Sequence, residues 1–307
     1  KKNYFINIKN EIVTNMGLEI ISIKSSFPKK FETLKDLKKT NNEWNLNKIY
    51  ESTGINKRYL SSKNEDIISL SIKSAKKIIN IKNRNKIGFL LFVTQTSPYK
   101  LPSSACIIQD KLKLPQDIFA ADINMGCSGF IYALKLAETL LNDSKKNLGL
   151  IICSDTYTKY INKSNRSCKP IFSDASASIL LKKRNKSAIG PFDFGVDGSG
   201  SSDLLLKNNS NNIFMNGPKI AIFTLNKIPT FIKNFIIRNK INKKAINLIA
   251  LHQASKYVCG KIQEKLNLNK KIFYNNFQKY GNTVSASIPL LLENAYRENK
   301  LKKNDLI

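Results

Sequence analysis

Short apolar strand-like segments alternate along the chain with segments that have helical spacing. The runs Ile87–Val93 and Leu148–Cys153 are almost wholly apolar, as strands covered on both faces are. Between them, apolar residues at helical spacing predict a helix that begins near Cys127. Strands that alternate with helices favour a largely parallel sheet covered by helices, so the predicted fold class is α/β.

The alternation continues along the rest of the chain. At 307 residues the chain can bury a large core, as one α/β domain or as two closely packed halves. We expect halves at residues 1–184 and 185–307. Further strands are predicted at 118–123, 177–181, 246–251 and 271–274, and further helices at 67–78, 103–112, 218–239, 255–266 and 284–297.

The formal net charge is +29, from 51 Lys and Arg against 22 Asp and Glu, which raises the question of an anionic partner. The basic residues are dispersed among many Asn and Ile residues, a pattern typical of A- and T-rich codons. Attraction to an acidic protein or an anionic substrate stays open. No basic motif interleaved with aromatic residues is present, so we expect no nucleic-acid partner.

The longest apolar runs that the pattern shows are far shorter than the about 20 residues that span a bilayer. The opening residues contain no long apolar signal region, so we expect a cytoplasmic protein that does not bind membranes. The five cysteines form no C-x-x-C pair, and the chain has one histidine. We therefore expect reduced thiols and no metal site.

Cys127 lies in the string Met125–Phe130, at a predicted turn between a strand and a helix. Small residues on both sides leave its sulfur accessible. The first turn of a helix has unpaired backbone N–H groups and a partial positive charge, which favours a nucleophilic thiolate. A cysteine beside glycines is also common as a tight packing point, and that alternative stays open.

Two further polar residues occupy similar junctions. His252 ends the predicted strand 246–251, and carboxyl ends of parallel strands are where reactive groups collect. Asn282 lies in a turn directly ahead of the helix predicted at 284–297. Each has a structural alternative, a satisfied histidine and a cap or turn asparagine. The three residues together favour an active site.

The order of these three strings is similar to the Cys-His-Asn constellation of β-ketoacyl-acyl-carrier-protein synthase III. The same family is resembled by Tyr50–Arg58, Leu101–Cys106, Phe172–Ala177 and Asp197–Gly200. The resemblance extends from about Gly17 to Ile307. It implies the thiolase fold, two similar α/β halves packed as αβαβα layers, and a homodimer.

The resemblance also implies an acyltransferase reaction and the roles of the site residues. Cys127 would take an acyl group from acyl-coenzyme A or an acyl carrier protein. His252 and Asn282 would stabilise the enolate formed when malonyl-acyl carrier protein loses carbon dioxide, and this enolate would attack the acyl-cysteine. No cofactor is implied, because coenzyme A and acyl carrier protein thioesters are the substrates.

Further residues match the family in position. Trp44 and Arg166 resemble the pair that holds the adenine of coenzyme A, and Ser255 and Lys256 follow the histidine where substrate-binding residues stand. Leu101 occupies the place of the gate that each subunit contributes to its partner's acyl pocket. Ser255 replaces the family's asparagine, and Leu101 its phenylalanine, which indicates a divergent branch.

These departures leave other functions open. One is an acyltransferase that moves the acyl group from Cys127 to a hydroxyl or amine of a specialised metabolite or surface glycan. Another is a catalytically inactive partner subunit, against which the presence of all three site residues argues. A serine hydrolase based on Ser128 is disfavoured because the string lacks the G-x-S-x-G elbow.

In the resembling family a strand and a glycine-rich turn follow the last helix, and a backbone N–H of that turn helps to hold the acyl oxyanion. The sequence ends at Ile307, where such a strand would begin. We therefore expect a truncated portion of a longer protein, which as given is poorly active and prone to associate.

Overall fold

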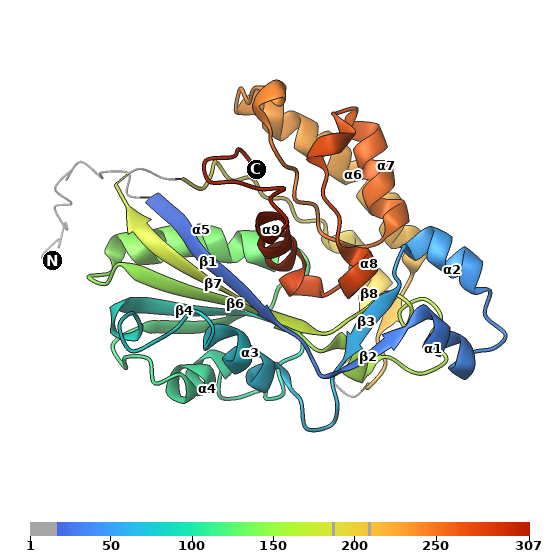
Figure 1. Ribbon diagram of the computed structural model, residues 1–307, viewed down its shortest axis with the longest axis horizontal. Helices are drawn as coiled ribbons and strands as arrows, with labels where there is room; N and C mark the ends of the chain where they lie inside the picture. The colour runs from blue at the N-terminus through green and yellow to red at the C-terminus, as the bar shows by residue number, and fades with distance from the viewer. Residues whose placement is uncertain (1–16, 186–187, 208–209) are drawn as a thin grey trace, which may run out of the picture.

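A five-stranded mixed sheet forms the centre of the first half, with the strand order β1-β7-β6-β4-β5 (Figure 1). The computed structural model describes residues 17–185, 188–207 and 210–307. The strands are β1 (Gly17–Ser26), β4 (Ile87–Val93), β5 (Phe119–Ile123), β6 (Leu148–Asp155) and β7 (Ala175–Arg184). Residues 1–16, on which the expectation about a signal region depends, lie outside the described residues. Lys186, next to the expected boundary between the two halves, lies outside them too.

Strand directions in this sheet correct the prediction of a largely parallel sheet. β4 pairs in parallel with both β5 and β6, whereas β7 pairs antiparallel with β6 and with β1. β1 was not predicted as a strand. All eight residues of β6 are buried, which explains why its sequence is a continuous apolar run rather than an alternating one.

Helices cover both faces of the sheet (Figure 1). On one face lie α3 (Ile67–Ala75) and α4 (Ser104–Lys111), and on the other lie α5 (Gly129–Asp143) and α9 (Ser287–Arg297). Phe89, Leu91 and Val93 pack with α5 and α9, while Leu90 and Phe92 pack with α3 and α4. The two-residue period of β4 therefore supplies both cores.

A small flanking unit precedes α3. It contains the hairpin of β2 (Lys30–Thr33) and β3 (Lys57–Leu60), with α1 (Leu34–Thr40) and α2 (Leu46–Thr53) between the two strands. Gly54 ends α2 in the left-handed conformation, with φ 66°, because its amide turns back to the carbonyl of Tyr50. This turn brings α2 against the second half of the chain.

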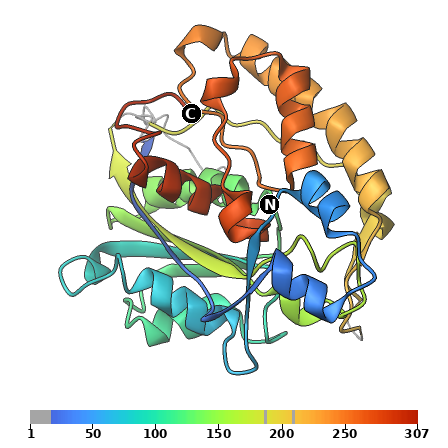
Figure 2. The same cartoon turned by 45° about the vertical axis from the view of Figure 1, so that its right-hand side comes forward.

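The second half is mainly helical. Its elements are the hairpin β8 (Leu204–Leu205) and β9 (Phe214–Met215), α6 (Gly217–Arg238), α7 (Lys256–Leu266), α8 (Phe277–Tyr280) and α9. Figures 1 and 2 show α7 between α6 and α2. The helices predicted at 218–239 and 255–266 are confirmed to within a residue at each end.

The strands predicted at 246–251 and 271–274 were wrong in extent. The first segment forms two isolated bridges, Ile246 with Leu306 and Ile249 with Phe273, and the second takes part only in the bridge at Phe273. Asn269 accepts a hydrogen bond from the amide of Lys271 and starts a short 3-10 turn that takes up the beginning of the second segment. The parallel bridge at Leu306 agrees with the strand start predicted at the end of the sequence.

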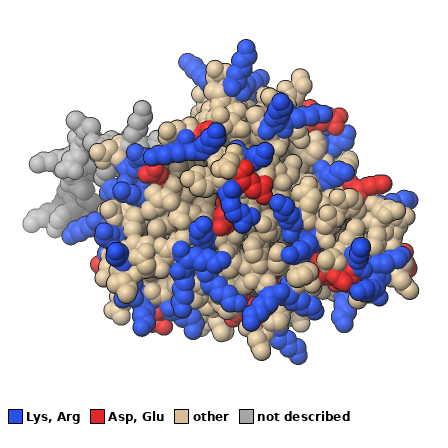
Figure 3. Space-filling model, viewed as in Figure 1, with Lys and Arg blue, Asp and Glu red and all other residues tan. Residues whose placement is uncertain are grey.

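By length and composition alone, α6 is long and apolar enough to cross a membrane. In this structure, 11% of its apolar stretch is buried. It also packs against α7 and contains Pro229. Figure 3 shows Lys and Arg side chains spread over the visible face rather than gathered in one patch. The dispersed charge predicted from the sequence is confirmed for this face.

Candidate active site

Cys127 lies in the turn that joins β5 to α5. The amide of Gly129 donates to the carbonyl of Gly126 at 2.9 Å and closes this turn. A Cβ at Gly129 would lie 2.4 Å from Cγ1 of Val93, and one at Gly126 would lie 2.4 Å from Oε1 of Gln95. Gly126 and Gly129 therefore let the backbone around Cys127 come close to β4 at Val93 and to Gln95.

The surroundings of Cys127 are apolar. The partly buried side chain packs against a cluster that contains Tyr157, Phe172, Ile213 and Val284, each no more than 7% exposed. Burial, and then the nearby carboxylate of Asp155, raise the pKa of Cys127 to about 12. The expectation of a stabilised thiolate was therefore wrong, because desolvation and a like charge outweigh the backbone groups at the helix start.

Asn282 is fixed by its own backbone and by the next turn. Its amide donates to the carbonyl of Ile171 at 3.0 Å, and its carbonyl accepts from the amide of Ser173 at 2.9 Å. The side-chain Oδ1 accepts from the amide of Val284 at 3.0 Å. Since Oδ1 is engaged, the side-chain amide N–H groups are the part of Asn282 that can donate to a ligand.

Gly281 makes this arrangement possible. Its φ of 68° lies in the left-handed region, and a Cβ there would lie 2.9 Å from Cβ of Ser173. Glycine directly before the asparagine is therefore a backbone requirement.

His252 is partly buried, and desolvation lowers its pKa to about 4. The imidazole is therefore neutral at physiological pH. Its Nδ1 is buried and has no hydrogen-bond partner among the described residues. The backbone carbonyl of His252 accepts from the Sγ of Cys259 at 3.4 Å and from the amide of Ala254 at 2.9 Å, which ties this residue to the chain that follows it.

One segment, Asn282–Ser287, connects the three predicted site residues. Val284 in this segment packs with Cys127, and its amide donates to Asn282. Oγ of Ser287 accepts from the amide of Gln253, directly after His252, at 2.8 Å. Cys127, Asn282 and the backbone next to His252 are thus all in contact with the segment that leads into α9.

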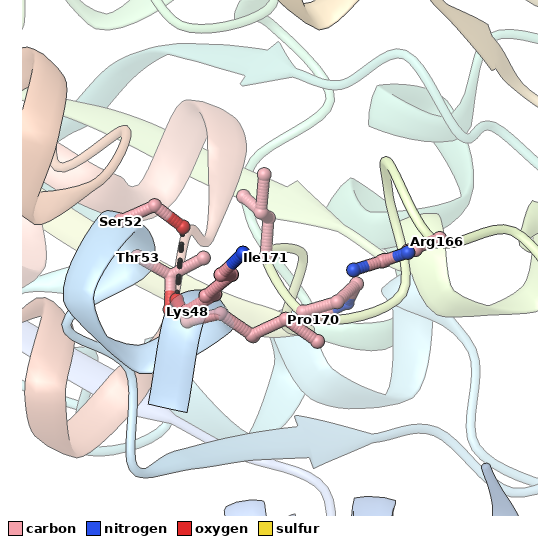
Figure 4. Close-up of a pocket in the computed structure, with 7 residues that line it drawn as sticks. Lys48, Ser52, Thr53, Arg166, Pro170 and Ile171 are labelled. Atoms are coloured by element: carbon pink, nitrogen blue, oxygen red, sulfur yellow. Dashed lines mark hydrogen bonds between the residues drawn. The ribbon is translucent and has the colours of Figure 1, made fainter. Parts of the chain in front are cut away.

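Arg166 lines a separate pocket of about 230 Å³ near α2. Figure 4 shows Ser52 and Thr53 of α2 on one side of the pocket and Arg166 on the other. Trp44 does not line it. Its ring is 5% exposed and packs with Leu37 and Ile49, so the structure brings Arg166 but not Trp44 to this pocket.

Ser255 and Lys256 begin α7. Oγ of Ser255 accepts from the amide of Val258 at 3.2 Å, so this serine is the N-cap of the helix. Cβ of Lys256 would lie 2.7 Å from a Cβ at Gly54, which places the start of α7 against the end of α2. Leu101 lies ahead of α4 and is 82% exposed.

Sequence reasoning missed three residues around the nucleophile: Gln95, Asp155 and Tyr157. The carboxylate of Asp155 is fully buried at the end of β6. Its signal in the sequence was a charged residue two positions after a long apolar run. No group of three or more His, Cys, Asp and Glu side chains in the described part of the chain could hold a metal ion.

Comparisons with known proteins identify the family of the chain. Residues 121–198 match the family model of 3-oxoacyl-[acyl-carrier-protein (ACP)] synthase III, and residues 236–307 match its C-terminal model. The chain is 31% identical to β-ketoacyl-[acyl-carrier-protein] synthase III of Aquifex aeolicus over 95% of this chain and 94% of that protein. It is 33% identical to the Campylobacter jejuni protein of the same name, over 93% and 91%.

Solved structures give the same result for the fold. The crystal structure of 3-oxoacyl-[acyl-carrier-protein] synthase III from Aquifex aeolicus superposes with a TM-score of 0.82 at 28% identity, covering 94% of both chains. A 3-oxoacyl-(acyl-carrier protein) synthase structure from Burkholderia xenovorans gives 0.83 at 27%, covering 92% of this chain and 86% of that one. The thiolase fold predicted from the motifs is confirmed, and the chain belongs to the β-ketoacyl-acyl-carrier-protein synthase III family of acyltransferases.

Proposed function

We propose that the protein transfers an acyl group from acyl-coenzyme A to Cys127 and condenses it with malonyl-acyl carrier protein. The observation that carries the proposal is the attachment of Cys127, His252 and Asn282 to the one segment Asn282–Ser287. Together with family membership, it supports a shared site for both half-reactions.

The first half-reaction is thioester exchange. The sulfur of Cys127 attacks the acyl carbonyl carbon, the bond from that carbon to the sulfur of coenzyme A breaks, and the thiol proton leaves with the coenzyme A sulfur. Because burial and Asp155 raise the pKa of Cys127, the resting group is a thiol that loses its proton during the attack. The apolar cluster beside the sulfur suits an acyl chain.

The second half-reaction needs donors aimed at an enolate oxygen. The carbon–carbon bond to the malonyl carboxylate breaks, carbon dioxide leaves, and the enolate carbon attacks the acyl-cysteine carbonyl. The bond from that carbonyl to the sulfur of Cys127 breaks, and the released thiolate takes one proton from water to restore the thiol. The neutral imidazole of His252 and the free amide N–H groups of Asn282 can stabilise the developing negative charge without a strong base.

We also propose a cytoplasmic homodimer that receives acyl carrier protein. β5 forms an edge of the sheet, and Phe119 on it is 50% exposed. Tyr99 and Leu101 in the nearby loop are 52% and 82% exposed. An exposed edge strand beside exposed apolar side chains suits pairing with a second copy, and the basic surface suits an acidic carrier protein (Figure 3).

Intact-protein mass spectrometry after incubation with a panel of acyl-coenzyme A thioesters tests the first half-reaction. We expect one acyl adduct, which Cys127→Ala removes and Cys106→Ala, the change of an exposed cysteine, retains. Release of carbon dioxide from malonyl-acyl carrier protein tests the second. An adduct without carbon dioxide release, combined with acylation of an added alcohol or amine, would support acyl transfer to those groups instead.

A further inference from the structure

The carboxylate of Asp155 is fully buried and joins two segments of the chain. Oδ1 accepts from the amide of Gln95 at 2.8 Å and from Oγ1 of Thr96 at 3.3 Å. Oδ2 accepts from the amide of Ser285 at 3.2 Å and also from its hydroxyl. Each carboxylate oxygen therefore holds a backbone N–H of a different segment.

The first of these segments packs against Gly126, the residue before Cys127. Gln95 follows β4, and its Oε1 lies 2.4 Å from the position of a Cβ at Gly126, so the side chain is packed against the residue before Cys127. The same Oε1 accepts from the hydroxyl of Tyr157 at 2.6 Å. By accepting the backbone N–H of Gln95, Asp155 fixes the position of the side chain that packs next to Cys127 at Gly126.

The second segment carries the asparagine. Val284 has a φ of 52°, a conformation that a β-branched residue adopts only when its surroundings enforce it. The amide of Val284 donates to Oδ1 of Asn282, and the amide and hydroxyl of the next residue, Ser285, donate to Asp155. The strained turn is thus held from both sides, and Asp155 supplies one of them.

We propose that Asp155 is a positioning residue for this active site, which holds Gln95 against the nucleophile and holds the turn at Ser285 that fixes Asn282. The inference rests on the proposed function. Its structural basis is that one carboxylate accepts backbone N–H groups from both segments.

An amide cannot replace this carboxylate. Since both oxygens accept from a backbone N–H, the NH₂ of an asparagine would face a donor on one side whichever way it is turned. The change Asp155→Asn would also remove a negative charge near Cys127, whose thiol pKa that charge raises. The variant should therefore lower the thiol pKa of Cys127 and, at the same time, disturb the turn at Ser285.

The chain offers a control at Glu65, a partly buried carboxylate ahead of α3. Its two oxygens accept from the amides of Lys29 at 3.2 Å and Ser62 at 3.5 Å, which also belong to different segments. Glu65→Gln creates the same donor conflict away from the site. Among the described residues, Glu65 makes no hydrogen bond to Gln95, Cys127 or Ser285.

The test compares both variants by alkylation of Cys127 with iodoacetamide and by carbon dioxide release from malonyl thioester. In Asp155→Asn we expect alkylation at neutral pH to rise about tenfold, as loss of a nearby like charge implies. We expect decarboxylation to fall about 10²-fold, the loss that follows a misplaced donor. Glu65→Gln should change each rate less than about threefold, within ordinary context effects.

Equal behaviour of the two variants would overturn the proposal, since it would assign Asp155 a structural role only. If Asp155→Asn does not fold, Ser285→Ala removes one donor to the carboxylate and keeps the backbone N–H. We expect it to lower decarboxylation about tenfold, and no change would overturn the proposal. Absence of acylation and decarboxylation in the unaltered protein would instead reject the proposed function, while the alkylation result would still report on Asp155.

Discussion

The hydroxyl of Tyr157 donates a 2.6 Å hydrogen bond to Oε1 of Gln95 beside the nucleophile. Tyr157 is 7% exposed and its ring lies 5.0 Å, centroid to centroid, from that of Phe172. Both rings belong to the cluster against which Cys127 packs. The phenol is thus anchored at its polar end and packed along its ring, and it limits the space next to the sulfur.

We therefore predict that Tyr157→Leu broadens the acyl groups accepted by Cys127. The smaller side chain removes both the ring and its anchor, so the ratio of octanoyl to acetyl transfer should rise at least about tenfold, the effect of a few methylenes in an apolar site. Acyl-enzyme mass spectrometry with both thioesters measures this ratio. Tyr296→Leu, at a residue 64% exposed on α9, is the matched control and should leave the ratio unchanged.

A pH dependence follows from the buried carboxylate. Burial raises the pKa of Asp155 from its ordinary 3.8 to about 6, against the opposing hydrogen bonds of Ser285 and Gln95. The titratable groups near it, Cys127, Cys153 and Tyr157, have raised pKa values and stay neutral through this range. Protonation of Asp155 removes an acceptor for a backbone N–H, so condensation should fall as the pH drops through about 6.

Stability should not fall in parallel. Because the folded pKa of Asp155 is above its unfolded value, this group stabilises the fold most below pH 3.8 and loses that contribution as the pH rises through 6. The pKa of His252 is lowered from 6.5 to about 4, so its contribution to stability has the opposite sign. This contribution is lost as the pH falls from 6.5 to about 4. The two contributions offset each other. Thermal unfolding at pH 5 and pH 7 should differ little, whereas parallel loss of fold and activity would contradict this reading.

We next predict that His252→Ala and Asn282→Ala each suppress decarboxylation more than acylation of Cys127. Loss of one donor to a developing oxyanion costs about 10²–10³ in rate. Stopped-flow acylation and carbon dioxide release, measured on the same preparations, separate the two half-reactions. Equal loss of both would show instead that the pair holds the fold.

The sequence predicted the first-half core well because its strands and helices have strong periodic patterns. β4, β6 and α5 were found from apolar spacing alone, and the family motifs placed Cys127 among them. β1 was missed because its residues do not form a continuous apolar run, and its partner β7 lies far along the chain. Pairing over such a separation leaves no local signal.

The site was predictable only in part. Motifs identified the positions of Cys127, His252 and Asn282, but not the burial that gives the first a raised and the second a lowered pKa. Both shifts are caused mainly by burial in the tertiary structure, and Asp155 adds to the shift of Cys127 only. The hydrogen-bond partners of Asp155 lie after β4 and ahead of α9. Periodicity does not report which segments meet at a buried carboxylate.

The proposed dimer gives a further prediction. Leu101→Lys and Phe119→Lys place charges on the exposed loop and on the edge strand β5, and together they should convert the dimer to a monomer. Light scattering at micromolar concentration measures the change. Ile237→Lys on α6, 67% exposed, is the control and should leave the mass unchanged. A monomeric unaltered protein with full activity would contradict both the dimer and the gate at Leu101.

Gly281 supports a last prediction, which connects backbone conformation to the site. Its φ of 68° strains any other residue, and a Cβ there would lie 2.9 Å from Cβ of Ser173 and 3.2 Å from the carbonyl of Ile171. Ile171 and Ser173 make the backbone hydrogen bonds that hold Asn282, so the added methyl would push apart the contacts that place the asparagine. Gly281→Ala should therefore destabilise the fold by about 1–3 kcal/mol and lower decarboxylation more than acylation. Denaturant unfolding gives the first quantity and the two half-reaction assays the second. Gly260→Ala within α7, where a Cβ meets nothing within 4 Å, is the control and should preserve stability. A Gly281→Ala protein that matches the unaltered one in both measurements would show that the turn does not determine where Asn282 lies.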